Sequence, residues 1–187
     1  RFLEGAILVY LKKIDIVAPN KNKANRELMD GKDKFAGAYV QDPQKGKHEW
    51  VYDLDITSMY PSIIMSLNIS PETKLGKLDS WDVEPFLKGV DRTYSIKDKN
   101  GKESAKLTTS EFKNFLETHN VSISSNGVLY TQDRKGLIPT LLENWFNDRV
   151  QFRKLAKKFA EQGDKEKYAY FDRRQYIQKV VLNSLYG

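Results

Sequence analysis

The sequence lacks residues on which several classes of protein depend. It contains no cysteine, which excludes a disulfide scaffold, a thiolate zinc site, an iron–sulfur cluster and a cysteine nucleophile. Its two histidines, His48 and His119, lie far apart and belong to no ligand motif. No apolar run approaches the ~18 residues of a membrane-spanning helix, and residues 1–4 (RFLE) do not resemble a signal peptide. We therefore expect a soluble intracellular protein without a membrane partner.

The residues that are present suit a folded domain with an anionic partner. A length of 187 residues fits one domain, or one domain with a protruding element. Hydrophobic residues make up 40%, and Lys and Arg (31) exceed Asp and Glu (25), for a net charge of +6. A mild positive excess favours a polyanion. Because the chain begins without Met and ends at Gly187, directly after a strongly patterned segment, we interpret it as a fragment.

The first third of the sequence shows strand patterns and one helix pattern. Residues 6–11 form an apolar run that predicts a short buried strand, and 12–34 are charged, as in a surface connection. Residues 35–40 predict the start of another strand. In 49–55, aromatic and aspartate positions alternate between two faces, which predicts a strand. Residues 57–67 then change to helical spacing, so a short helix should follow a tight turn.

The remainder predicts two hairpins and a pair of helices. Asn-Gly at 100–101 and at 126–127 indicates hairpin turns, and 110–118 predict a short helix. Thr140 and Glu143 have the spacing of a capping box at a helix start. A break at 163–164 precedes a second helix over about 165–186. Because the connection is short, the two helices should pack antiparallel, giving an α+β fold.

Two aspartates near a strand end are candidate metal ligands. Asp53 and Asp55 project from one face of the expected strand, at its carboxyl end. Mg²⁺ prefers one or two carboxylates together with water and phosphate oxygens. Aspartates at strand ends also commonly form turns or cap helices, so both interpretations stay open on spacing alone.

Polar and basic residues gather on the two C-terminal helices. At 100° per residue, one arc of the second helix is polar, and the first helix carries a basic ridge. Such faces are commonly solvated, but Lys, Tyr and Asn could also hold a triphosphate and a base pair. The ridge and the polar arc could converge on one anion. The arc contains Asp172, Gln175, Tyr176, Lys179, Asn183 and Tyr186, and the ridge contains Arg149, Arg153 and Lys157.

Two segments resemble the catalytic motifs of family B DNA polymerases. Residues 55–64 (DITSMYPSII) are similar to the first motif, D-x-x-S-L-Y-P-S-I-I, and 179–187 (KVVLNSLYG) to the second, K-x-x-x-N-S-x-Y-G. Residues 68–73, 125–127 and 134–139 resemble the replicative polymerases of T-even-type bacteriophages. The resemblance covers nearly the whole chain from residue 35 onward. Met59 stands where the family usually has Leu, a nearly isosteric exchange.

The resemblance implies roles for the first motif. Asp55 matches the aspartate that binds both catalytic metals, and Ile56 would offer its backbone carbonyl to the metal on the incoming nucleotide. Ser58, Met59 and Tyr60 would wrap the triphosphate, partly through backbone N–H groups at a helix start. Tyr60 matches the residue that selects dNTP over rNTP. Asp53 is outside the family's invariant set, so for Asp53 we favour a structural role.

The resemblance also implies which basic side chains contact the nucleotide. Arg149 matches the arginine of the fingers that grips the γ-phosphate, and Arg153 matches its weaker companion. Lys179 matches the lysine that contacts the triphosphate and is a candidate catalytic general acid for the pyrophosphate leaving group. All three residues are therefore expected to bind nucleotide.

Other matching positions are implied to contact the base pair or DNA. Asn183 matches a nucleotide-binding residue that supports the nascent base pair. Tyr186 and Gly187 match residues beside that pair. Residues 35–40 are similar to the small-residue element that contacts the template, which implies DNA binding at Gly37 and Ala38.

The resemblance implies part of a right-hand polymerase: an antiparallel palm sheet carrying Asp55 plus two antiparallel fingers helices, with palm at 1–139 and fingers at 140–187. It implies DNA-directed transfer of dNMP from dNTP to a primer 3′-hydroxyl, with two Mg²⁺ ions, in the cytoplasm (of the host, if viral). The motif Y-G-D-T-D-S, with the second metal-binding aspartate, does not occur in these residues, so the chain alone should be inactive.

The implied partners are primer–template DNA, dNTP and the remainder of a polymerase: the third motif, the thumb and the exonuclease, in the same or a separate chain. A sliding clamp is a further candidate. The alternative is a basic module that binds nucleic acid or nucleotide without catalysis, which is compatible with the net charge and the tyrosine content. A pure binder, however, has no need of the carboxylate at Asp55.

Overall fold

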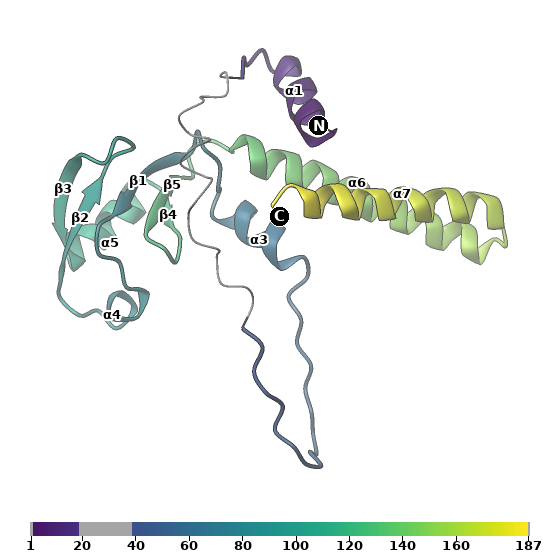
Figure 1. Ribbon diagram of the computed structural model, residues 1–187, viewed down its shortest axis with the longest axis horizontal. Coiled ribbons are helices and arrows are strands. Elements are labelled where there is room, and N and C mark those ends of the chain that lie inside the picture. The colour runs from purple at the N-terminus through teal and green to yellow at the C-terminus, as the bar shows by residue number, and fades with distance from the viewer. Residues whose placement is uncertain (1, 19–38, 187) are drawn as a thin grey trace, which may run out of the picture. The chain divides into compact units, whose positions relative to one another are not determined.

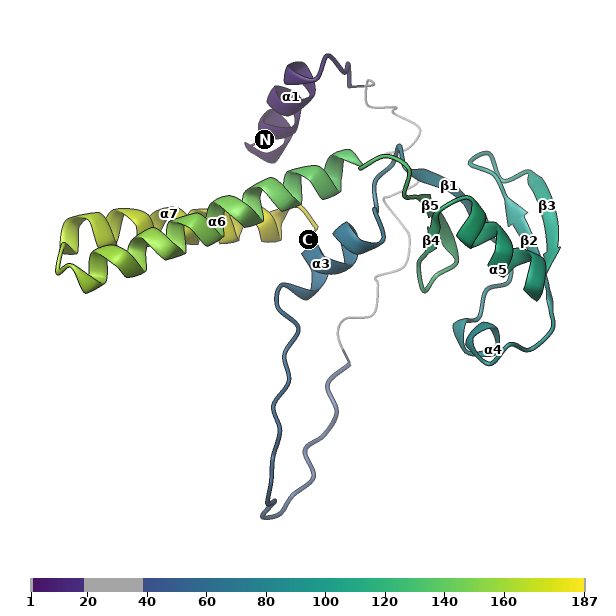
Figure 2. The ribbon, with the colours of Figure 1, turned by 180° about the vertical axis from the view of Figure 1, so that it is seen from behind.

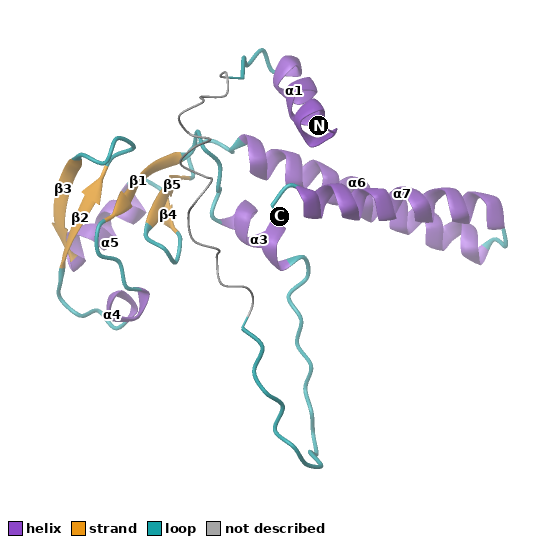
Figure 3. Ribbon diagram, in the orientation of Figure 1, coloured by secondary structure: helices purple, strands orange, loops and turns teal. Residues whose placement is uncertain are grey.

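The chain has an α+β fold, and a computed structural model describes residues 2–18 and 39–186. It divides into two units, Arg1–Asp55 and Ile56–Gly187. Helices and strands are distinguished in Figure 3. Among the described residues, no helix has both the length and the apolar character needed to cross a membrane. The expected division into parts at 139/140 stays a prediction.

The first unit begins with a helix where a strand was expected. Helix α1 spans Phe2–Lys13, with Glu4 in its first turn and Lys12 and Lys13 in its last. This charge order complements the helix dipole. The prediction of a strand over 6–11 was wrong because a short apolar run alone does not distinguish a buried strand from a helix. The expected connection over 12–34 and the strand start over 35–40 fall mostly on 19–38, outside the described residues.

The rest of the described first unit is irregular and exposed. Residues 51–56 form no strand or helix, and Trp50, Tyr52 and Leu54 are 91%, 87% and 90% exposed. The prediction of a strand over 49–55 was therefore wrong, and Asp55 does not lie on the sheet of the second unit. Alternation predicts which side chains share a face, but a strand forms only where a neighbour pairs with its backbone.

The second unit opens with the expected short helix. Helix α3 spans Met59–Ser66, and Ser58 precedes it in the left-handed region with φ 51°. The Ser62 hydroxyl donates to the Thr57 carbonyl at 3.1 Å, which closes the turn. Pro61 is tolerated because it lies in the first turn, where N–H groups have no partner within the helix.

Five antiparallel strands form the sheet of this unit, in the order β3-β2-β1-β5-β4. Its two hairpin turns were predicted correctly, with Gly101 at φ 81° and Gly127 at φ 79°. Strand β1 pairs with β5, far along the chain, so the sheet joins the two hairpins. The strands are β1 Lys74–Leu78, β2 Thr93–Lys97, β3 Glu103–Thr108, β4 Val121–Ile123 and β5 Val128–Thr131.

An aromatic core fills the space between this sheet and helix α5. Helix α5 spans Thr109–Thr118, as predicted, and carries Phe112, which is 0% exposed. The Phe112 ring lies 5.2 Å from Tyr94 and 5.7 Å from Phe86, centroid to centroid. Phe86 comes from the short helix α4, Val83–Leu87. This core stabilises the sheet independently of the motif residues, because none of them contributes to it.

Two long helices complete the unit. Helix α6 spans Leu137–Glu161 and α7 spans Lys165–Ser184. They lie side by side in both views (Figures 1 and 2). Phe159 stacks on Phe171 at 5.5 Å, whereas Arg174 lies over Phe152. Because later residues of α7 meet earlier residues of α6, the pair is antiparallel, as predicted.

The start of α6 differs from the predicted one. Helix α6 begins at Leu137, and no side chain of its own caps it. Thr140 and Glu143 form no capping box: the Thr140 hydroxyl donates to the Gly136 carbonyl at 2.7 Å, and Glu143 pairs with Lys135. The spacing fits a capping box only if Thr140 precedes the helix, and here it lies inside the first turn.

Candidate functional site

Helices α3 and α7 bring the two motif segments into contact. The rings of Tyr60 and Tyr186 stack with centroids 5.4 Å apart and an angle of 18° between their planes. Tyr60 lies in the first turn of α3, and Tyr186 follows the end of α7. Helix α3 also packs against α6. Residues separated by more than a hundred positions in the sequence thus form one aromatic surface, and the Tyr60 side of it remains exposed.

Polar groups surround Tyr186. Its hydroxyl donates to the Asn183 side-chain oxygen at 2.9 Å. Burial and the neighbouring Tyr60 raise the pKa of Tyr186, while the positive charge of Arg149 acts in the opposite direction. Tyr186 therefore stays protonated at neutral pH and keeps its role as a donor. Arg149, Asn183, Tyr60 and Tyr186 consequently form the part of the predicted site that the structure brings together.

Arg149 is incompletely satisfied. Within the described part of the chain, its Nε is buried and has no hydrogen-bond partner. A buried donor without an acceptor is costly, and native structures contain few of them. Because a guanidinium can donate paired hydrogen bonds to phosphate, Arg149 stays a candidate phosphate ligand.

The other basic side chains predicted to bind nucleotide, Lys179 and Arg153, are exposed. Lys179 lies one turn before Asn183 on α7, and Arg153 lies one turn beyond Arg149 on α6. Arg153 lines a shallow hollow together with Val150, Lys154 and Lys157, and Lys157 approaches Glu161 at 4.0 Å. Nothing in this geometry joins Arg153 or Lys179 to the stacked tyrosines, so their convergence on one anion stays a prediction.

The start of α3 presents the remaining residues of the first motif. Met59 and Ile56 are exposed, and Ser58 is half-buried. The Ser58 side chain makes no capping hydrogen bond, so the first N–H groups of α3 are not capped by it. Such N–H groups favour a phosphate. Gly37, Ala38 and Gly187 lie outside the described residues.

The metal-ligand hypothesis rests on few donors. Asp53 and Asp55 are both exposed, in the last residues of the first unit. Among residues 2–18 and 39–186, no group of three or more His, Cys, Asp or Glu could hold a metal ion. The Asp55 carboxylate and the Ile56 carbonyl are hard oxygen donors of the kind that Mg²⁺ prefers. These two donors would supply only part of the ligands of such an ion.

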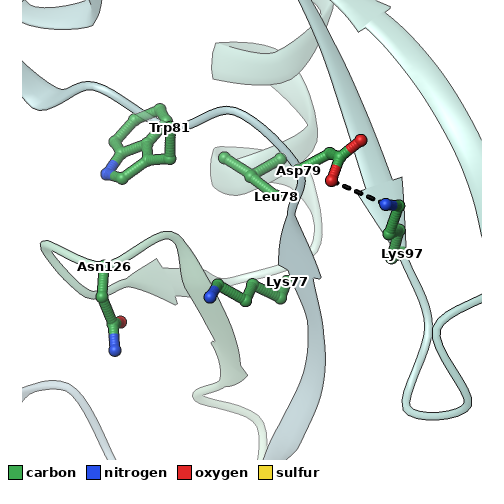
Figure 4. Close-up of a pocket in the computed structure, with 6 residues that line it drawn as sticks. All are labelled: Lys77, Leu78, Asp79, Trp81, Lys97 and Asn126. Carbon is green, nitrogen blue, oxygen red and sulfur yellow. Dashed lines mark hydrogen bonds and ion pairs between the residues drawn. The ribbon is translucent and has the colours of Figure 1, made fainter. Parts of the chain in front are cut away.

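A second hollow lies in the sheet region of the second unit. It measures about 290 Å³ and is lined by Lys77, Leu78, Asp79, Trp81, Lys97 and Asn126 (Figure 4). No residue predicted for the site lines it. Lys97 is already paired with Asp79 at 2.6 Å, which lowers its attraction for an anion. We assign it no role in the candidate site.

Sequence reasoning missed the residues that hold the start of α6. Asn68, Ser70 and Glu72, in the loop after α3, bond to the backbone N–H groups of residues 136–138. The sequence carried one usable signal. Residues 136–138 (GLI) offer no polar side chain to cap a helix, so the cap had to come from elsewhere in the chain.

Comparison with known proteins gives one consistent result. The family model described as DNA polymerase family B matches residues 2–187. A DNA-directed DNA polymerase of Escherichia phage RB69 is 30% identical over 118 residues, 63% of this chain and 10% of the relative. That of Enterobacteria phage T4 is 30% identical over 135 residues, 72% and 12%.

An archaeal relative matches over a longer stretch. A DNA polymerase of Thermococcus sp. (strain 9oN-7) is 27% identical over 186 residues, which is 99% of this chain and 18% of the relative. The chain therefore spans only between 10% and 18% of the lengths of these three relatives.

Proposed function

The chain belongs to DNA polymerase family B, and from this premise we propose that it supplies the nucleotide-binding part of a DNA-directed DNA polymerase. The reaction is transfer of dNMP from dNTP to a primer 3′-hydroxyl, with release of pyrophosphate. The observation that carries the proposal is the stack of Tyr60 on Tyr186 beside Arg149. It joins a residue of the first motif to residues of the helix pair, as a single nucleotide site requires.

Different residues of the proposed site bind the sugar and the phosphates of the nucleotide. The exposed ring of Tyr60 offers a flat surface against the deoxyribose, where a 2′-hydroxyl would collide. Arg149, whose Nε lacks a partner within the described residues, binds the γ-phosphate, and Arg153 adds positive charge one turn further along α6. Ser58 and Met59 present backbone N–H groups to the phosphates. Positioning and charge neutralisation of this kind carry most of phosphoryl transfer.

The remaining roles concern the leaving group and the base pair. Lys179 donates a proton to the departing pyrophosphate as the general acid. Asn183 and Tyr186 line the nascent base pair, with Gly187 beside it, and Gly37 and Ala38 contact the template. Movement of the helix pair α6–α7 toward a correctly paired nucleotide would couple base-pair geometry to catalysis.

Asp55 and the Ile56 carbonyl would hold Mg²⁺ in this reaction. Two such ions, when bound, stabilise the attacking and the leaving oxygens. Because Asp55 is one carboxylate, the remainder of the polymerase would supply the second aspartate, together with a thumb and an exonuclease. That remainder is in the same or a separate chain. Primer–template DNA, dNTP and a sliding clamp complete the proposed partners, and the proposed location is the cytoplasm.

Single-nucleotide extension by the assembled polymerase that contains this chain tests the proposal. Arg149→Ala should raise the KM for dNTP at least tenfold, because the γ-phosphate loses its bidentate donor. Arg173→Ala, an exposed arginine on α7 that lines a different hollow, is the matched control and should leave the KM unchanged. Equal KM values for the Arg149→Ala and wild-type enzymes would contradict the assignment.

A further inference from the structure

The start of α6 is capped entirely by another segment. Asn68 Oδ1 accepts from the Gly136 N–H at 2.8 Å, Glu72 Oε1 accepts from the Leu137 N–H, and Ser70 Oγ accepts from the Ile138 N–H at 3.3 Å. The next residue is proline, which has no N–H to satisfy. One loop, Asn68–Thr73, therefore supplies every acceptor that the first turn requires. We call this loop the clasp.

Hydrogen bonds hold both the side chain and the backbone carbonyl of Asn68. Its side chain is 3% exposed, and its Nδ2 donates to the carbonyls of Thr131 at 2.6 Å and Arg134 at 2.8 Å. Its own carbonyl accepts from the buried Thr73 hydroxyl at 2.6 Å. Rotation of the amide would break three hydrogen bonds at once and leave polar atoms of the buried Asn68 side chain unpaired.

The close approach of Gly136 to Ser70 and the negative charge of Glu72 also stabilise the clasp. A Cβ on Gly136 would lie 2.7 Å from the Ser70 Cβ, so only glycine lets the two segments approach this closely. Partial burial alone would raise the pKa of Glu72, but hydrogen bonds from the Leu137 N–H and the Ser70 hydroxyl, together with the charge of Arg134, lower the pKa below its usual value. Glu72 is therefore anionic at neutral pH, at the end of α6 where a negative charge is favoured.

The clasp also begins where α3 ends. The backbone N–H of Asn68 donates to the Met65 carbonyl, and that of Ile69 to the Ile64 carbonyl. The loop thus joins the helix that carries Tyr60 to the helix that carries Arg149 (Figure 1). At roughly 1.5 Å rise per residue, Arg149 lies about 18 Å along α6 from Leu137. A tilt of about 10° at the clasp would displace it by about 3 Å, far more than nucleotide positioning tolerates.

We propose that Asn68 and Glu72 are positioning residues that fix the direction of α6 relative to α3 and so place Arg149 opposite Tyr60. Neither side chain belongs to the nucleotide site proposed above. The consequence for dNTP binding rests on the function proposed above, whereas the consequence for the two helices does not. The two can therefore be tested separately.

The geometric test uses the absence of cysteine from the sequence. Spin labels on Ser66→Cys in α3 and Lys154→Cys in α6, both exposed positions, report the distance between the helices by double electron–electron resonance. We expect one narrow distribution in the otherwise unchanged chain and a broadened or shifted one in Glu72→Ala and Asn68→Ala. Glu72→Gln keeps an acceptor for the Leu137 N–H and should largely restore the narrow distribution.

The matched control is a helix cap elsewhere in the fold. Glu111 accepts from the Thr108 N–H and hydroxyl at the start of α5, so Glu111→Ala removes a similar cap without touching the clasp. It should leave the α3–α6 distance unchanged. An unchanged distribution in Glu72→Ala, or equal broadening in Glu111→Ala, would overturn the proposal. Because Glu72 is exposed, Glu72→Ala keeps the test usable even if Asn68→Ala fails to fold.

The functional test is the KM for dNTP in the assembled polymerase. Glu72→Ala should raise the KM at least fivefold and change kcat less, Glu72→Gln should recover most of the loss, and Glu111→Ala should change neither. A KM unaffected by a clasp variant that does broaden the distance distribution would overturn the positioning role. A KM unaffected by Arg149→Ala would instead contradict the proposed function and leave the distance result standing.

Discussion

At the scale of single residues, some residues of the candidate site are held by contacts within the protein, whereas others are exposed. Tyr60, Tyr186 and Asn183 are held by direct contact, and the charge of Arg149 acts on Tyr186. Asp55 is exposed, at the end of the first unit. A packed tyrosine keeps its place without ligand, whereas a metal-binding carboxylate acquires most of its partners only when ion and substrate bind. Substitution of Asp55 should therefore affect the chemistry and not the fold.

Asp55→Asn separates a polymerase from a binding module. In the assembled polymerase, loss of the carboxylate charge should lower turnover by on the order of a thousandfold, because metal stabilisation of the transition state is worth several kcal/mol. Salt-dependent DNA binding should remain nearly unchanged, since it depends on cations. Primer extension and DNA titrations at two salt concentrations measure the two effects. Full turnover in Asp55→Asn would favour the non-catalytic alternative, and Asp91→Asn, in the sheet region, is the control.

At the scale of elements, the helices differ in how their first turns are satisfied. Helix α5 is capped by its own Thr108 and Glu111, and α7 by Asp164, which accepts from the Lys167 N–H at 3.0 Å. Helix α6 depends on the clasp. Because these caps come from neighbouring residues, the starts of α5 and α7 can be predicted from the sequence. The direction of α6 depends instead on contacts formed only when the second unit folds.

The carboxylate caps predict the response to acid. Hydrogen bonds from the Thr108 N–H and hydroxyl lower the pKa of Glu111 below its usual 4.5, and the Lys167 N–H and side chain lower that of Asp164 below 3.8. A pKa lower in the folded state gives stability that is present above the unfolded pKa and is lost as pH falls through the folded one. In urea titrations, the free energy of unfolding of Glu111→Gln should therefore lie below that of the wild type at pH 7, and the difference should be much smaller at pH 3. An equal difference at both pH values would argue against a charge effect.

One glycine is required by the sheet. A Cβ on Gly76 would lie 2.3 Å from the Lys97 carbonyl oxygen, a backbone atom that no side-chain rotation can move aside. Gly76→Ala must shift β1 against β2, so the free energy of unfolding should fall by about 1–3 kcal/mol. Gly5→Ala, in α1 with nothing within 4 Å of the added Cβ, should cause no loss. Urea titrations measure both, and a Gly76→Ala protein as stable as the wild type would refute the close approach.

At the scale of the whole molecule, the chain spans only part of the length of its relatives. It covers between 10% and 18% of three relatives, and the motif that carries the second metal-binding aspartate does not occur among its residues. Under the function proposed above, a two-metal reaction would need both carboxylates to neutralise phosphate charge. What the second unit does have is a core of its own, centred on Phe112, to which none of the candidate site residues contributes.

We predict that the isolated 187-residue chain extends no primer in Mg²⁺ and dNTP. Supplying the missing polymerase region, in the same chain or as a second one, should restore extension, and Asp55→Asn in the restored assembly should slow it by on the order of a thousandfold. A gel assay of a labelled primer with time points of minutes to hours detects even slow addition. Measurable Mg²⁺-dependent extension by the isolated chain would show that a second carboxylate among these residues completes the site.

Local patterns determined much of the fold. The hairpin turns at Asn100-Gly101 and Asn126-Gly127, the helix after Ser58, and the break at Gly163 were all readable because each depends on neighbouring residues in the chain. The two motif segments likewise identified the family and named the residues of the candidate site.

Only the tertiary structure decided which elements find partners. Residues 49–55 alternate like a strand yet stay irregular, and residues 6–11 join a helix, because pairing and burial depend on segments that local pattern does not specify. The stack of Tyr60 on Tyr186 and the capping of α6 by Asn68 and Glu72 likewise join segments far apart in the sequence. Contacts of this kind form when the chain folds back on itself, so the sequence determined the chemistry of the site, and the packing of α3, α6 and α7 determined its geometry.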